Sequence, residues 1–338
     1  MRTDIGVVAT APPIDSLALR AYRLGDAAAI PEMWNRAMQA DDVPWRVDTA
    51  ELENWFGQAN DKFDPARDLF MVEADGALVA TADAEWVDTT DGLREFRVGA
   101  IVDPAWRRRG IGSWLQRHLE AHAHRLWAAY PAADRQPMLG SWAMDKETAR
   151  IALLRRFGFE QARWFFDMLR PSLEQIDEAV LPEGLEFRPL GEEQLHQLWA
   201  ADMEAFQDHW GGFDGSEESF LRWRNDPKFD LNLLVVAWDG DEIAGGVVNE
   251  INEVENAAFN RKRGWLQSVF VRRPWRRRGL GRAVVLRSLQ ALRDRGMTSA
   301  GLGVDADNPT GALGLYTGTG FEVEHRSAAY RKPLEASE

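Results

Sequence analysis

Two arginine- and glycine-rich segments of this chain have the composition of an anion-binding loop. Both follow the pattern Arg-x-x-Gly-x-Gly, once from Arg107 to Gly112 and once from Arg276 to Gly281. Glycines let the backbone turn tightly and bring its N–H groups close to a phosphate, and a helix that starts there adds the positive end of its dipole. Neighbouring arginines can add charge-assisted hydrogen bonds. The pattern indicates binding of a phosphorylated ligand rather than a solvated run of charge.

The same two loops indicate an internal duplication. Gly110 and Gly279 lie 169 residues apart, which is half of the 338-residue chain. Each loop follows a β-like run, ending at Val102 or Val271, and each is followed by a helix-like run. The length agrees with two domains, at about 150 residues for each.

The elements that position the loops are also predicted twice. A short strand at 17–20, and again at 185–188, precedes a run with apolar residues at helical spacing. Asp75-Gly76 and Asp239-Gly240 stand between apolar runs, which is typical of a hairpin. Two long helices and two closing strands are then expected at about 111–128, 280–295, 164–169 and 328–331.

This order predicts an α/β (α+β) fold with two similar domains, each a mixed, mostly antiparallel twisted sheet flanked by helices. The expected parts are a tail at 1–16, a first domain at 17–170, a linker at 171–184 and a second domain at 185–338.

Composition narrows the class of protein. The net charge of −14 argues against nucleic-acid or anionic-membrane binding, which need a basic field. Without cysteine, the chain has no disulfide, thiolate metal ligand or cysteine nucleophile. His118 and His122 lie one helical turn apart, and a solvated helix face is expected there rather than a metal site. No apolar run reaches 18 residues and no signal peptide is evident, so a cytoplasmic protein is expected.

With these motifs together, the chain resembles a tandem protein of the GNAT superfamily, the general control non-repressible related N-acetyltransferases. The resemblance covers about Leu17 to Leu334 and is strongest in the second half. The residues that carry it there are Val271, Pro274, Asn308, Tyr316, Gly320 and Phe321. The two-copy layout with an active-looking second copy is similar to the mycothiol synthase-like group.

The resemblance implies acetyl-CoA, or another acyl-CoA, as the donor and no metal. The pyrophosphate would rest on the backbone amides of 276–281, with Arg277 and Arg282 as phosphate partners. The pantetheine would pair with the strand at 269–271, where two parallel strands splay apart. The implied cofactor residues are Val269, Phe270, Val271, Arg276, Arg277, Arg278, Gly279, Leu280, Gly281, Arg282, Asn308 and Tyr316.

Acyl transfer from a thioester to an amine needs a proton acceptor for the amine and benefits from an acid beside the departing thiolate. The resemblance makes Tyr316 this acid, and the alternative is a tyrosine packed in the core. Asn308 would bond the pantetheine or cap the helix that follows. Glu250 and Asp305 are the carboxylate candidates for the base, and a structural role is the alternative for both. A water relay oriented by Ser268 is also open.

The first half departs from this pattern. Aligning Gly158 with Gly320 places Leu154 where Tyr316 stands and Lys146 where Asn308 stands. The first copy therefore keeps the loop without the acid, and it is expected to bind CoA poorly or non-productively and to act as a scaffold. Catalysis with a different acid is the alternative. The residues of a second cofactor site would be Val102, Arg107, Arg108, Arg109, Gly110, Ile111 and Gly112.

The acceptor is expected beside the segment that contains His209, Trp210 and Phe213, which could stack on a sugar or ring; an ordinary packed loop is the alternative. A small-molecule primary amine is the leading acceptor, such as an amino sugar, an aminoglycoside or a cysteinyl pseudodisaccharide. The competing functions are a non-catalytic acyl-CoA-binding regulator or scaffold and a protein N-terminal acetyltransferase. The chain would be a monomer or a homodimer.

Overall fold

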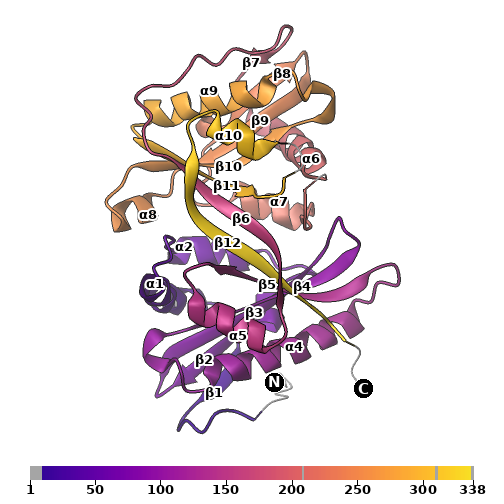
Figure 1. Ribbon diagram of the computed structural model, residues 1–338. Helices are drawn as coiled ribbons and strands as arrows, with labels where there is room; N and C mark the ends of the chain where they lie inside the picture. The colour runs from indigo at the N-terminus through magenta and orange to yellow at the C-terminus, as the bar shows by residue number, and fades with distance from the viewer. Residues whose placement is uncertain (1–9, 208, 309–310, 336–338) are drawn as a thin grey trace. The chain divides into compact units, whose positions relative to one another are not determined.

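The computed structural model describes residues 10–207, 209–308 and 311–335. Contacts divide the chain into two compact units, Met1–Arg163 with Ser327–Glu338, and Trp164–Arg326. Each unit is built around one mixed β-sheet with helices on both faces (Figure 1). The expected fold class is confirmed.

The first unit has six neighbouring strands in the order β1-β2-β3-β4-β5-β12. Only β4 and β5 run parallel, and the other pairs are antiparallel. The strands are β1 (Ala18–Ala21), β2 (Leu69–Ala74), β3 (Ala77–Asp88), β4 (Leu93–Val102), β5 (Gln136–Met144) and β12 (Glu322–Pro333), of which residues 327–333 pair with β5.

Alternating side chains on β2 show how the helices cover this sheet. Phe70 and Val72 pack with α4 (Ile111–Ala129), whereas Leu69 and Met71 pack with α1 (Ile30–Ala40) and α2 (Thr49–Gly57). Because successive residues of a strand point to opposite faces, α4 covers one face and α1 with α2 the other. Two shorter helices are α3 (Pro65–Asp68) and α5 (Thr148–Arg156).

The second unit repeats this plan in the order β6-β11-β10-β9-β8-β7, with only β10 and β11 parallel. Its strands are β6 (Glu160–Arg170), β7 (Glu186–Phe187), β8 (Val235–Asp239), β9 (Glu242–Glu250), β10 (Arg263–Val271) and β11 (Ser299–Asp305). One face packs against α9 (Leu280–Asp294), and the other against α6 (Leu195–Phe206) and α7 (Glu217–Arg224). The remaining helices are α8 (Glu253–Ala258) and α10 (Ala312–Thr317).

The last strand of each half pairs within the other half's sheet. Residues 165–170 of β6 pair with β11, and residues 327–333 of β12 pair with β5. Tyr330 and Leu334 accordingly lie in the core of the first unit, and Met168 lies in that of the second. The expected domains at 17–170 and 185–338 follow the order of the chain, whereas the compact units differ from them by this exchange of strands.

The predicted hairpin turn in the first half and the predicted starts of the two long helices are confirmed. Asp75 and Gly76 have φ angles of 52° and 78°, the left-handed pair that a two-residue hairpin turn requires. The long helices begin at Ile111 and Leu280 as expected.

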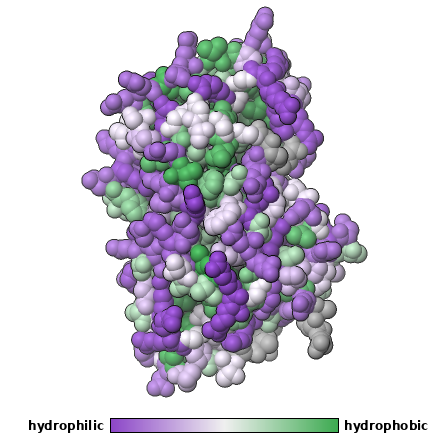
Figure 2. Space-filling model, viewed as in Figure 1, coloured by the Kyte–Doolittle hydropathy of each residue, from purple (hydrophilic) through white to green (hydrophobic). Residues whose placement is uncertain are grey.

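The expected solvated face at His118 and His122 is wrong. Both imidazoles are buried edge-on against Phe70, with ring centroids 4.5 and 5.1 Å away. His122 Nε2 lies 2.8 Å from a carboxylate oxygen of Asp68. Within the described residues, no group of His, Asp and Glu is arranged to hold a metal ion. Among these residues, no helix is long and apolar enough to span a bilayer. The face of the protein in Figure 2 is mainly hydrophilic, with scattered apolar residues.

Candidate active site

The two glycine loops have the same backbone conformation. Arg108 and Arg277 have φ angles of 64° and 60°, and Gly110 and Gly279 have φ angles of 91° and 90°. Each glycine is the N-cap residue of a long helix, α4 or α9. Left-handed residues before a helix turn successive N–H groups toward one concave point, which suits a phosphate. The loops therefore fit the diphosphate of a CoA thioester.

The arginines of the second loop have different roles. Arg276 donates from Nε to the carbonyl of Val271 at 2.9 Å, so it ties the loop to the end of β10. Arg282 is paired with Asp177 at 2.6 Å, and Arg278 reaches only a backbone carbonyl at 3.4 Å. Arg277 makes no hydrogen bond or ion pair with any residue that the structure describes. Among these four, Arg277 is the side chain available to an anion.

The parallel strands β10 and β11 separate before the loop is reached. Their last pair is Leu266 with Leu302, yet β10 continues to Val271 and there pairs only with β9. The edge of 268–271 that faces β11 is therefore left for another partner. A pantetheine arm carries amide groups that can pair with such an edge, as an added strand does.

Tyr316 lies on α10 and is 6% exposed. Its ring meets that of Phe321 edge-on at 6.1 Å, and its hydroxyl makes no hydrogen bond within the described part of the chain. Burial raises its pKa, so the hydroxyl keeps its proton at neutral pH. The side chain is thus a proton donor that no described residue accepts from.

Asn308 is not the N-cap residue of α10. The helix begins at Ala312, and its N-cap is Gly311, with a φ of 79°. The backbone N–H of Asn308 instead donates to the carbonyl of Asp305 at 3.1 Å. The capping alternative is therefore wrong. Pro309, expected as the first helical residue, lies outside the described residues.

The two carboxylates predicted as bases lie at the ends of β9 and β11. Glu250 ends β9 and pairs across from Trp265, before the two parallel strands part. Asp305 ends β11, where its carboxylate accepts the N–H of Asp307 at 3.0 Å. The Asp305 carboxylate therefore orders the turn that follows the strand.

Asp202, which was not considered from the sequence, lies at the point of separation. It is 8% exposed on α6, and the hydroxyl of Ser268 donates to it at 2.6 Å. Ser268 stands two residues beyond the last β10–β11 pair. Burial raises the pKa of Asp202 to about 7, and the hydrogen bond from Ser268 opposes this shift. The sequence carried one signal, because Asp202 follows Leu198 by four residues and so lies on the buried stripe of α6.

The residues expected to line the acceptor site form an aromatic group after α6. The ring of His209 stacks on Phe206 at 4.3 Å, and Phe206 meets Phe213 at 5.1 Å. Trp210 lies 6.0 Å from Phe165, between ring centroids. Phe213 is 48% exposed, so its ring is open to a ligand.

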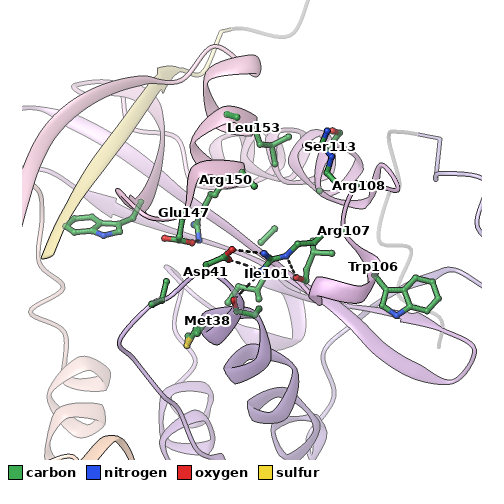
Figure 3. A pocket seen from close by; sticks show the side chains of 18 of the residues that line it. Met38, Asp41, Ile101, Trp106, Arg107, Arg108, Ser113, Glu147, Arg150 and Leu153 are labelled. Atoms are coloured by element: carbon green, nitrogen blue, oxygen red, sulfur yellow. Dashed lines mark hydrogen bonds and ion pairs between the residues drawn. The ribbon is translucent and has the colours of Figure 1, made fainter. Parts of the chain in front are cut away.

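The first unit has a cavity of about 980 Å³ beside its own glycine loop. Met38 borders it from α1 and Asp41 from just after that helix, Ile101 from β4, and Glu147 and Arg150 from the start of α5 (Figure 3). The remaining lining includes most of the expected second cofactor residues, namely Val102, Arg107, Arg108, Gly110 and Gly112.

In the first half, the residues that align with Tyr316 and Asn308 have structural roles. Leu154, in the place of Tyr316, is buried in the core. Lys146, in the place of Asn308, forms an ion pair with Asp42. Arg107 forms two hydrogen bonds with Asp41, at 2.7 and 2.9 Å, and so cannot hold a phosphate without releasing it.

Comparison with known proteins agrees with this geometry. Residues 193–321 match the model of the Acetyltransferase (GNAT) family, and residues 65–161 match that of an Acetyltransferase (GNAT) domain. The mycothiol acetyltransferase of Geodermatophilus obscurus is 29% identical over 311 residues, which cover 90% of this chain and 94% of that one.

Solved structures agree over nearly the whole chain. A GCN5-related N-acetyltransferase from Sphaerobacter thermophilus is 27% identical with a TM-score of 0.70, covering 96% of this chain and 98% of its own. A tandem GNAT protein from the clavulanic acid biosynthesis pathway has the same fold at 16% identity and a TM-score of 0.67, covering 95% of this chain and 100% of its own. The chain therefore belongs to the GNAT family, as an N-acetyltransferase with two such domains in tandem that takes its acetyl group from acetyl-CoA.

Proposed function

We propose that the C-terminal GNAT domain transfers the acetyl group of acetyl-CoA to the primary amine of a small molecule by direct attack. The observation that carries this proposal is Tyr316, a buried hydroxyl with no hydrogen bond to a described residue, on the helix after the separated strands. The first half has Leu154 at this position and offers no such proton.

Acetyl-CoA supplies the thioester carbonyl, and this chain's residues bind, orient and move protons. The backbone N–H groups of 277–281 and the guanidinium of Arg277 hold the diphosphate. The free edge of Val269, Phe270 and Val271 aligns the pantetheine. Tyr316 gives its proton to the departing sulfur, because CoA leaves more readily as a thiol than as a thiolate.

Asp202 is the base that the geometry favours. Its pKa of about 7 makes it able both to accept a proton and to release it near neutral pH. Ser268 lies on β10 where this strand separates from β11 and donates to Asp202, so it relays the proton or orients the water that does so. Glu250 and Asp305 are the alternative bases.

The aromatic group of His209, Trp210 and Phe213 supports a small acceptor with a ring, because exposed aromatic faces stack on sugars and rings. The Geodermatophilus relative, a mycothiol acetyltransferase, supports the same class of acceptor. The cavity of the first unit supports a second acyl-CoA site there, with Val102, Arg108, Gly110 and Gly112 beside it.

Tyr316→Phe tests the proposal with the least disturbance, since it removes one oxygen atom from the core. We expect acetylation of amino sugars, followed as CoA release, to fall about 100-fold while the affinity for acetyl-CoA is kept. Tyr330→Phe is the matched control, because Tyr330 is equally buried but lies in the core of the first unit. Full activity in Tyr316→Phe would contradict the assignment of the acid and of the active half.

A further inference from the structure

The cavity of the first unit carries more positive than negative charge. Among the described residues that line it, four are arginines and two are carboxylates. Each carboxylate has one of these arginines within ion-pair distance, at 2.7 and 3.6 Å. The arginines left over are Arg108 and Arg156, so the cavity suits a ligand with anionic groups.

Arg108 belongs to the glycine loop and has an equivalent in the second half. It corresponds to Arg277, and neither side chain makes a hydrogen bond or ion pair within the described part of the chain. Both loops also have the same backbone conformation before their helices. The diphosphate of a CoA molecule would therefore find the same groups in each half.

The packing of α5 on α4 is repeated by α10 on α9, and this contact matches positions between the halves. A Cβ atom at Gly112 would lie 3.4 Å from Leu153 of α5, and a Cβ atom at Gly281 would lie 3.3 Å from Leu315 of α10. The corner between the loop helix and the next helix is thus built in the same way twice.

The arginine at this corner comes from opposite elements in the two halves. Counted from the matched contacts, Arg156 corresponds to Gly318, and Ser113 corresponds to Arg282. In the first half, Arg156 at the end of α5 donates to the hydroxyl of Ser113 at 3.1 Å. In the second half, Arg282 on α9 donates to the carbonyl of Gly318 at 2.7 Å and pairs with Asp177 at 2.6 Å. Arg156 has no carboxylate within ion-pair distance among the residues that the structure describes.

A second arginine adds to the positive charge beside Arg156. The guanidinium carbons of Arg117 and Arg156 lie 5.5 and 5.7 Å from the centre of the Phe157 ring. Arg117 likewise has no carboxylate within ion-pair distance in the described ranges. The residues that correspond to Arg117 and Phe157 are Leu286 and Thr319, which are both buried. Only the first half therefore concentrates uncompensated charge at this corner.

We propose that the first half recognises the 3′-phosphate of CoA through Arg156, with Arg117 beside it, and that the second half does not. This rests on the second acyl-CoA site proposed for the same cavity. The loops serve the diphosphate alike in both halves, and the remaining phosphate of CoA is the one on the 3′ oxygen of its ribose. A guanidinium fits that group because it can donate two parallel hydrogen bonds to a phosphate. The first half thereby distinguishes CoA from dephospho-CoA.

The test is calorimetric titration of the full chain with CoA and with dephospho-CoA, which lacks only the 3′-phosphate. Gly279→Glu isolates the first site, and Gly110→Glu isolates the second. We expect the first site to bind CoA about tenfold more tightly than dephospho-CoA, as one added hydrogen-bonded contact between charged groups provides. The second site should bind the two ligands equally.

A variant of Arg156 shows which phosphate it contacts. Added to Gly279→Glu, Arg156→Gln should weaken the binding of CoA about tenfold and leave the binding of dephospho-CoA unchanged. The unchanged affinity for dephospho-CoA also shows that the variant is folded. Arg155→Gln is the matched control, because Arg155 is the exposed neighbour on α5 and is not among the described residues that line the cavity. It removes the same charge and should leave both affinities unchanged.

The outcomes separate this inference from the proposed function. Equal affinities of the first site for CoA and dephospho-CoA would overturn the inference and leave the second acyl-CoA site in place. A loss in Arg156→Gln that is the same for both ligands would assign this arginine to the diphosphate and overturn the inference too, as would an equal effect of Arg155→Gln. Absence of CoA binding in Gly279→Glu would refute the second acyl-CoA site and the inference together. Acetylation of glucosamine by Gly110→Glu measures the C-terminal domain independently of all three.

Discussion

Replacing Asp202 by asparagine should make the protein more stable and less active, to an extent that depends on pH. The carboxyl of Asp202 has its pKa raised from 3.8 to about 7 by burial. At ~1.36 kcal/mol for each pKa unit, this shift corresponds to about 4 kcal/mol of folding free energy. Asparagine keeps the shape and the acceptor for the Ser268 hydroxyl without ever being charged.

The direction in which stability changes with pH depends on which state, folded or unfolded, binds the Asp202 proton more tightly. The folded protein retains this proton up to about pH 7, whereas the unfolded chain releases it near 3.8. Wild-type stability therefore falls as the pH rises from 3.8 to about 7, and the whole cost is present above that pH. The asparagine variant lacks this cost at every pH.

Thermal melts at pH 5 and pH 8 measure the effect. A unit of this size gains about 2–4 °C for each kcal/mol, so Asp202→Asn should melt roughly 10 °C above the wild type at pH 8 and much closer to it at pH 5. Its amine acetylation at pH 8 should be about 100-fold lower. A variant that melts at or below the wild type at both pH values would refute the argument, because it would show that the carboxylate is stabilised rather than strained by its surroundings.

Two further predictions concern the loops and a buried histidine. Gly279→Glu forces a side chain onto a residue with a φ of 90° and directs a carboxylate to the phosphate loop. Calorimetric titration with acetyl-CoA should therefore show loss of the site in the second half for Gly279→Glu, and loss of the site in the first half for Gly110→Glu. Two sites retained in both variants would contradict the loop assignment. His118 has its pKa lowered from 6.5 to about 4 by burial, so the wild type should lose about 3 kcal/mol as the pH falls from 6.5 to 4. His118→Leu should therefore move the acid-unfolding midpoint to lower pH. An unchanged midpoint would show that folding does not lower the pKa of His118.

The features that were predicted correctly from the sequence are those that depend on a few neighbouring residues. The turn at Asp75-Gly76 and the start of each long helix depend on a few residues that permit left-handed backbone, and both are where the pattern indicated. The duplication of the fold was visible in the spacing of the two loops. The proposed acid, Tyr316, followed from its position in a family motif.

The parts that long-range packing determines were not predicted. The alternation in Trp164–Leu169 fits pairing with any neighbouring strand, and only the assembled sheets show that it pairs with β11. Asp202 becomes informative through burial, since a carboxylate on an ordinary helix is expected at the surface. His118 was placed wrongly for the same reason, because polar side chains one turn apart do not reveal which face of α4 meets the sheet.

The exchanged strands have a consequence for synthesis. The ribosome releases most residues of the first unit before those of the second, yet the first unit's sheet is completed by residues 327–333, which follow the whole second unit in the chain. A nascent chain therefore holds β5 with an unpaired edge until residues 327–333 have been made, and such an edge is prone to pair with another chain. A product that terminates before residue 327 would carry its defect in the half that was made first.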